Sequence, residues 1–223
     1  MANSYLNKTP SSSSNRKTFT FSCWFKKSTA GSGQYGRLFS CYSDSNNRDE
    51  IYFHPTNDTI NIESVVSSSA IVNFTSNKKF RDTNGYYHFV YAVDTTQATE
   101  SNRVKIYING VQETSWSVST YPSQNADLNF NNNIIHYIGR SGYNSGSNSY
   151  FDGYMSHVSF VDGQALAPTS FGETDSTSGI WKFKSPSGIT WGTNGFHLKF
   201  ENSGALGTDS SGNSNTFAVN GNL

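Results

Sequence analysis

Charge, cysteine and long apolar runs are all scarce in this sequence, and each shortage excludes a class of protein. Lysine plus arginine and aspartate plus glutamate both number 16 among 223 residues, so the formal net charge is zero. Nucleic-acid-binding proteins carry a basic excess or stripe, and a membrane-spanning helix needs about 20 consecutive apolar residues. Residues 1–4 also lack the basic start and apolar stretch of a secretory signal. We therefore expect no nucleic-acid partner, no membrane segment and no secretory signal.

Cysteine is limited to Cys23 and Cys41. A chain of this length buries enough surface to fold without disulfide or metal staples. Cys23 alternates in register with the phenylalanines around it, which is typical of a small buried hydrophobic residue. The alternative is a disulfide between neighbouring strands, if the protein reaches an oxidising compartment. The sequence leaves both alternatives open.

Hydrophobic residues make up only 34% of the chain, but aromatic residues alone make up 15%. Aromatic side chains suit the pleated, half-buried surface of a sheet. Asn, Ser, Thr and Gly fill the stretches between the apolar segments, which favours many strands joined by polar turns. Chains of about 220 residues with this pattern commonly form one unit, so we expect a single domain over residues 1–223.

Period-two alternation and turn residues locate the strands. The clearest alternation lies in residues 18–26, where Phe19, Phe21, Cys23 and Phe25 share the inner face. Trp24 points the other way, toward a second layer or a partner. Asn109-Gly110 is a strong signal for a two-residue hairpin turn. The other strands are predicted at 5–6, 37–42, 50–54, 59–67, 70–74, 86–93, 103–108, 111–118, 134–139, 153–161, 180–183, 189–191 and 196–200, with a polar loop at 43–49 and one helical turn within 165–172.

Short strands at this spacing indicate an all-β fold, a two-sheet antiparallel jelly-roll sandwich. The segments that carry a family resemblance lie within these strands: Gly85–Val90, Asp94, Val104–Gly110, Tyr137–Arg140, Phe151–Met155, Val158–Phe160 and Gln164–Pro168. Their order resembles the concanavalin A-like jelly rolls of the laminin-G-like and pentraxin-like kind. In ordinary laminin-G-like domains an Asp-Ser-Ser-Gly-Asn stretch lies near the beginning, whereas here it spans 209–213. We therefore expect residues 196–223 to pair beside the N-terminal strand.

A narrower resemblance is to concanavalin A-like domains of bacteriophage virion proteins. It rests on the segments Ser4–Pro10, Asn15–Thr18, Asp162–Leu166, Phe171–Asp175, Thr193–Phe196 and Asp209–Asn213. The resemblance implies a non-enzymatic structural protein on the virion surface, as a capsid decoration or a head or tail fibre component. Its partners would be other virion proteins and copies of itself in a homo-oligomer such as a trimer, after assembly in the host cytoplasm. A stand-alone carbohydrate-binding module is the alternative function.

Catalytic constellations are missing from the sequence. A glycosidase of this fold needs two carboxylates on one face, about 5 Å apart in a retaining enzyme. Glu50 is followed by Ile51-Tyr52-Phe53, which adds no second carboxylate to that strand. His88 lies between aromatic residues without an acidic neighbour, so we expect it to be buried with one ring nitrogen bonded to the backbone. The other histidines show no metal-ligand spacing. We therefore predict that the protein is not an enzyme.

The candidate binding site is the loop around residues 141–150. It mixes amides and hydroxyls with aromatic faces, as binding loops do. Tyr143 and Tyr150 would stack on a sugar ring, while Asn144 and Asp152 would bind its hydroxyls. A surface loop without a ligand is the alternative. We expect no cofactor, although Asp94, Asp127 and Asp152 supply oxygen ligands for calcium if the fold brings them together.

Overall fold

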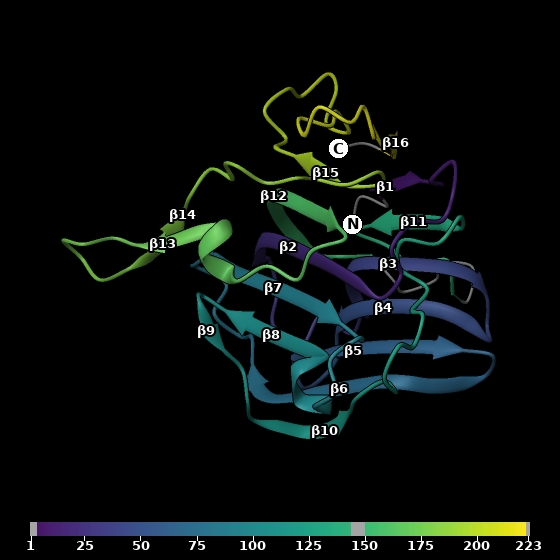
Figure 1. Cartoon of the computed structure of the whole chain (residues 1–223). Helices are drawn as coiled ribbons and strands as arrows, with labels where there is room; N and C mark the ends of the chain where they lie inside the picture. The colour runs from purple at the N-terminus through teal and green to yellow at the C-terminus, as the bar shows by residue number, and fades with distance from the viewer. Residues whose placement is uncertain (1–3, 144–149, 222–223) are drawn as a thin grey trace.

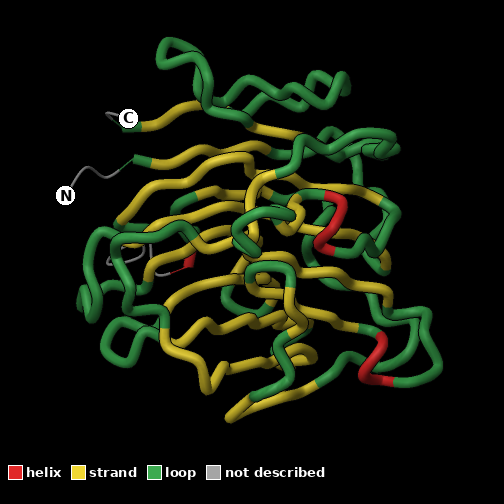
Figure 2. The backbone as a smooth tube through the Cα atoms, turned by 90° about the vertical axis from the view of Figure 1, so that its left-hand side faces the viewer, coloured by secondary structure: helices red, strands yellow, loops and turns green. Residues whose placement is uncertain are grey.

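The computed structural model describes residues 4–143 and 150–221, and it has the expected all-β jelly-roll fold with two facing antiparallel sheets (Figure 1). Within these residues, helix occurs only in short turns between strands (Figure 2). The eight-stranded sheet has the spatial order β10 (Trp116–Thr120), β6 (Ser69–Lys79), β5 (Thr59–Val66), β4 (Asn47–Phe53), β3 (Gly36–Asp44), β11 (Ile135–Ile138), β1 (Tyr5–Lys8) and β16 (Ala218–Asn220). The six-stranded sheet has the order β15 (Phe196–Leu198), β12 (Gly153–Asp162), β2 (Thr18–Lys27), β7 (Tyr87–Asp94), β8 (Val104–Ile108) and β9 (Val111–Gln112). The described residues also form a hairpin of β13 (Gly172–Thr174) and β14 (Trp181–Phe183) and the 3-10 turns Glu100–Asn102 and Pro168–Ser170.

The core between the sheets is built largely from phenylalanine. Phe19, Phe21 and Phe25 of β2 are fully buried, as their alternation predicts. Phe21 stacks on Phe39 of the opposite sheet with ring centroids 4.6 Å apart. Each fully buried ring of this size contributes about 1.5–3 kcal/mol through removal of apolar surface from water. The aromatic content of the sequence therefore provides the main cohesion between the two sheets.

A second layer covers the outer face of the six-stranded sheet. It is formed by the stretch 163–195, which includes the β13–β14 hairpin and packs Phe171 against Val90 and Val161. Trp24 points into this layer, with its ring centroid 6.5 Å from that of Phe183 of β14. The expectation of a second layer over Trp24 is confirmed.

The turn between β8 and β9 forms at Asn109-Gly110 as predicted, with positive φ at both residues (50° and 81°). A Cβ at Gly110 would lie 2.6 Å from the ring of Trp181. Glycine is therefore needed there for the turn and for the close approach of the second layer.

Several sequence-based boundaries are wrong. The predicted strand at 111–118 divides into β9 and β10, which belong to different sheets, and 189–191 forms no strand. The predicted loop at 43–49 is a tight turn, since β3 ends at Asp44 and β4 begins at Asn47. Cys23 and Cys41 are free and buried in opposite sheets, so they are not on neighbouring strands.

Residues 196–223, expected beside the N-terminal strand, divide between the two sheets. β16 pairs with β1, whereas β15 pairs with β12. Among the residues that the structure describes, no helix is long and apolar enough to cross a membrane.

Candidate functional site

The outer face of the eight-stranded sheet carries tyrosine and arginine side chains. Along β3 and β4, Cys41 and Ile51 point into the core, so their neighbours Tyr42, Glu50 and Tyr52 point outward. We name this surface the tyrosine–arginine face. Its members are Tyr5, Tyr35, Tyr42, Tyr52, Tyr137, Tyr143 and Tyr150, with Arg37, Arg48 and Arg140.

Each arginine of this face stacks on a tyrosine ring. The guanidinium carbon of Arg48 lies 4.3 Å from the ring centroid of Tyr143, and that of Arg140 lies 4.6 Å from Tyr5. Arg140 also lies 5.6 Å from the ring centroid of Tyr150. Such cation–π contacts contribute about 0.5–1 kcal/mol at exposed sites, and they hold the rings in place without an apolar cover.

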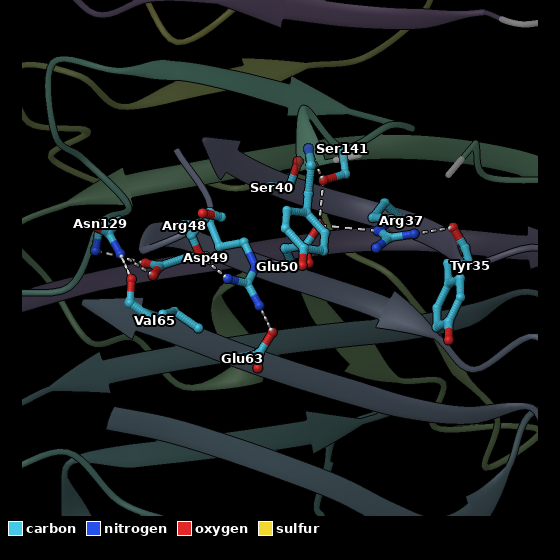
Figure 3. A network of polar contacts seen from close by, with 12 residues as sticks. Tyr35, Arg37, Ser40, Arg48, Asp49, Glu50, Glu63, Val65, Asn129 and Ser141 are labelled. Atoms are coloured by element: carbon cyan, nitrogen blue, oxygen red, sulfur yellow. Dashed lines mark hydrogen bonds and ion pairs between the residues drawn. The ribbon is translucent and has the colours of Figure 1, made fainter. Parts of the chain in front are cut away.

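An ionic network underlies the centre of the face (Figure 3). Glu50 is only 2% exposed, with Oε1 3.2 Å from Arg37 Nε and Oε2 3.6 Å from Arg48 Nε. Arg48 also reaches Glu63 of β5, with Nη2 3.0 Å from Oε2. Arg37 and Arg48 thus compensate the charges of Glu50 and Glu63. A carboxylate that is nearly buried requires such compensation. Burial is also the main cause that raises the pKa of nearby Tyr52 to about 12, which keeps this phenol neutral.

Ser141 connects this network to the predicted binding loop. Its hydroxyl donates a hydrogen bond to Glu50 Oε1 and accepts one from the backbone N–H of Tyr143 at 3.0 Å. Ser40 Oγ in turn donates to the carbonyl of Arg140 at 2.7 Å. Both bonds tie the start of the loop to β3 and β4, so the sheet determines where the Tyr143 ring lies.

Glu50 and Glu63 form a carboxylate pair that we did not predict. The sequence search considered only one strand, whereas these residues are direct partners on adjacent strands β4 and β5. Cross-strand partners have Cβ atoms about 4.5–5.5 Å apart. Arginine nitrogens contact both carboxylates, however, and Glu50 is almost inaccessible to solvent. The pair is therefore arranged as a structural ion network.

The predicted site residues are partly brought together. Tyr143 and Tyr150 both lie on the tyrosine–arginine face, next to Tyr42 and Tyr5 respectively. Asn144 lies outside the described residues. Asp152 directly precedes β12 of the other sheet, and its backbone carbonyl accepts a hydrogen bond from Ser28 N at 3.1 Å.

The three aspartates considered for calcium do not converge. Asp94 pairs with Thr18 at the start of β2, whereas Gly153, next to Asp152, pairs with Lys27 at its end. At about 3.3 Å per residue, the start and the end of β2 lie roughly 30 Å apart. Asp94 Oδ1 instead accepts hydrogen bonds from Thr96 in its own turn. Within the described ranges no cluster of three His, Cys, Asp or Glu residues could hold a metal ion.

His88 is buried as predicted, but its partners are side chains and not the backbone. The indole N–H of Trp181 donates to Nδ1 at 3.0 Å, and Nε2 lies 2.9 Å from Ser22 Oγ. Because Nδ1 accepts, Nε2 carries the proton and donates to the serine. Burial lowers the pKa of His88 to about 3. This histidine is a neutral residue of β7 that the second layer covers.

The chain belongs to the concanavalin A-like lectin/glucanases superfamily, which residues 2–170 match. No curated protein matches the sequence. The match covers the strands from β1 to β12, which include most of the tyrosine–arginine face.

Solved structures with a similar fold have low sequence identity. The heptameric SAP-like pentraxin from Limulus polyphemus is 17% identical, with a TM-score of 0.50 over 74% of this chain and 71% of the pentraxin. The enzymatically active domain of bacteriophage CBA120 tailspike protein 2 is 9% identical, with a TM-score of 0.50 over 74% of this chain and 25% of the tailspike chain. Domains LG4-5 of the mouse laminin α1 chain are 11% identical, with a TM-score of 0.47 over 72% of this chain and 40% of the laminin chain. These likenesses concern the fold.

Proposed function

We propose that the protein is a non-enzymatic carbohydrate-binding module and that its glycan binds on the tyrosine–arginine face. The observation that carries this proposal is the set of tyrosine rings held by arginine stacking on the outside of the eight-stranded sheet. Tyr5, Tyr42, Tyr137, Tyr143 and Tyr150 are half-buried, so each ring keeps part of its surface open to a ligand.

A glycan suits this surface for physical reasons. The apolar side of a sugar ring can stack on a phenol ring, and tyrosine adds a hydroxyl that can donate or accept a hydrogen bond. Rings already immobilised by Arg48 and Arg140 lose little conformational entropy on binding. Because Arg37 and Arg48 are paired with Glu50 and Glu63, these four charges compensate one another and do not favour a strongly charged ligand.

The absence of catalysis is part of the proposal. A general acid or nucleophile must reach the glycosidic bond, but Ser141, Arg37 and Arg48 cover the Glu50 carboxylate. Incubation with laminarin or bacterial polysaccharide is expected to release no reducing sugar. Release that disappears in a Glu50→Gln variant would refute this part.

The proposed setting is the surface of a bacteriophage particle, where the module would bind virion proteins, copies of itself and a host-surface glycan. Support comes from the virion-protein resemblance of the six sequence segments named above and from the similar fold within a phage tailspike. We expect particle-associated, oligomeric protein in virion preparations. Sedimentation that finds only free monomer, with none on virions, would count against this setting.

The decisive experiment for glycan binding is a glycan array followed by titration calorimetry with the best ligand. Tyr143→Ala and Tyr150→Ala are each expected to weaken binding about tenfold, since an aromatic contact is worth about 0.5–1.5 kcal/mol and tenfold corresponds to about 1.4 kcal/mol. Tyr154→Ala is the matched control, because Tyr154 is 62% exposed but belongs to β12 of the other sheet. An array without any ligand, or equal affinity in all three variants, would contradict the proposal.

A further inference from the structure

Two histidines far apart in sequence meet on the outer face of the six-stranded sheet. His157 lies on β12 and His197 on the adjacent edge strand β15. His157 Nδ1 is 3.3 Å from His197 Nε2, and the two nitrogens share a hydrogen bond in which one donates and the other accepts. Two imidazole nitrogens bound to one tetrahedral zinc ion at 2.0–2.1 Å would lie about 3.3–3.4 Å apart. The pair therefore already has the nitrogen spacing of adjacent ligands of one metal ion.

A bulge in β12 brings His157 to this position. Between Ser156 and Ser159 the register with β2 shifts, so that His157 and Val158 stand against a single residue, Cys23. Val158 stays in the core, and His157 turns outward with a positive φ of 48°. A bulge commonly re-aims a side chain in this way.

The backbone at His157 indicates that an imidazole is kept there at a cost. Glycine adopts a positive φ without penalty, whereas other residues there cost of order 1–3 kcal/mol, and such residues cluster at functional sites. The imidazole contributes no core packing between the sheets, since Val158 fills that place.

Aromatic rings hold both imidazoles in fixed planes. The His157 ring stacks on Phe183 with centroids 3.6 Å apart, and the His197 ring stacks on Trp191 at 5.6 Å. Phe183 and Trp191 both belong to the second layer, so the packing of that layer fixes the orientation of the two imidazoles.

The pair is open to solvent on the His157 side. His157 is only half-buried, whereas His197 is 4% exposed. Lys199 and Glu201 act on His157 with opposite signs and lie 3.8 Å apart, so their charges largely cancel. No third His, Cys, Asp or Glu of the described residues completes the cluster. The remaining coordination positions would be filled by water.

We propose that His157 and His197 form a binding site for a divalent transition-metal ion such as Zn²⁺, and that the ion links β12 to the edge strand β15. Imidazole ligands select zinc, nickel and copper, whereas calcium and magnesium prefer oxygen. The site is separate from the tyrosine–arginine face and does not depend on glycan binding.

Thermal unfolding of the full chain with and without Zn²⁺ tests this site. At a zinc concentration about 100 times the dissociation constant, binding to the folded state is expected to raise the midpoint by about 5–10 °C. An equal concentration of Ca²⁺ is expected to leave it unchanged. A zinc effect matched by calcium would overturn the proposal, because it would indicate oxygen ligands.

Three variants locate the ion. His157→Gly removes one ligand and relieves the positive-φ strain, so this variant should fold at least as well as the parent protein while losing the zinc effect. His197→Gln should weaken zinc binding at least about tenfold. His54→Gln is the control, because His54 lies directly after β4 and contacts Thr56. No zinc effect in the parent protein, or an undiminished effect in His157→Gly, would refute the site.

Discussion

The outer faces of the two sheets carry aromatic side chains in different surroundings. On the six-stranded sheet, Trp24 and His88 are covered by Trp181 and Phe183 of the second layer. On the eight-stranded sheet, Tyr5, Tyr137 and Tyr143 are held by arginines and stay half-exposed. We call the outer face of the six-stranded sheet the closed face. The tyrosine–arginine face of the eight-stranded sheet is, by contrast, the open face.

The difference separates stability from recognition. An aromatic ring under a second layer contributes its full apolar area to folding. A ring fixed at the surface by a cation keeps its orientation and still leaves area for a ligand. Changes on the closed face should therefore affect mainly the free energy of unfolding, and changes on the open face should affect mainly binding.

Lowering the pH is expected to have the largest effect on the free energy of unfolding. It acts through buried histidines of the closed face and the core. Burial lowers the pKa of His88 to about 3 and the pKa values of His136 and His197 to about 4. Unfolded histidine titrates near 6.5, so the unfolded state binds these protons more tightly and stability falls as the pH drops below about 6.5. Between pH 7 and pH 5, each of these three histidines should lower the free energy of unfolding by about 2 kcal/mol.

Asp49 opposes this loss. Burial raises the pKa of its carboxyl to about 6, so the folded state binds this proton more tightly and gains about 1 kcal/mol over the same interval. Urea unfolding at pH 7 and pH 5 should show a net loss on the order of 5 kcal/mol. Equal stability at both pH values would mean that these imidazoles are not neutral in the folded protein.

Trp181→Ala is the next largest change. It removes the donor to His88 Nδ1 and the ring that packs against Gly110 and Gly172. We expect a loss of about 3 kcal/mol in the free energy of unfolding, measured by urea denaturation. Tyr143→Ala on the open face should cost less than about 1 kcal/mol. Similar losses in the two variants would remove the distinction between the closed and open faces.

Glu50→Gln tests the ion network under the open face. The substitution leaves Arg37 and Arg48 opposite a neutral amide, so we expect the free energy of unfolding to fall by about 1–2 kcal/mol. We also expect weaker glycan binding, because Ser141 no longer positions Tyr143 as firmly. Glu201→Gln is the control. Its partner Lys199 is 3.8 Å away at the surface, and such pairs contribute about 0–1 kcal/mol. A Glu50 variant that behaves like the Glu201 control would show that the network is dispensable.

Much of the fold could be predicted from local patterns. The alternation of Phe19, Phe21 and Phe25 located β2 and its inner face, and Asn109-Gly110 located a hairpin turn, because strand period and turn geometry depend on neighbouring residues. The boundary at 43–49 was missed because polar residues on an outward-facing strand resemble a loop. That error hid the strand position of Arg48.

The candidate site could be predicted only in part. Tyr143 and Tyr150 stood out because aromatic rings occur in a polar loop. Tyr5, Tyr42 and Tyr137 were missed, although alternation within their predicted strands assigns each of them an outward direction. The pairing of Glu50 with Glu63 and the contact of Arg48 with both required the register between β4 and β5.

Period-two alternation was sufficient to assign the all-β class, the phenylalanine core and most strands, since all three follow from neighbouring residues on one strand. Which strands lie beside one another depends on contacts between residues far apart in the chain. For that reason the segment that covers Trp24, the arginine-held tyrosines and the meeting of His157 with His197 became visible only in the folded chain.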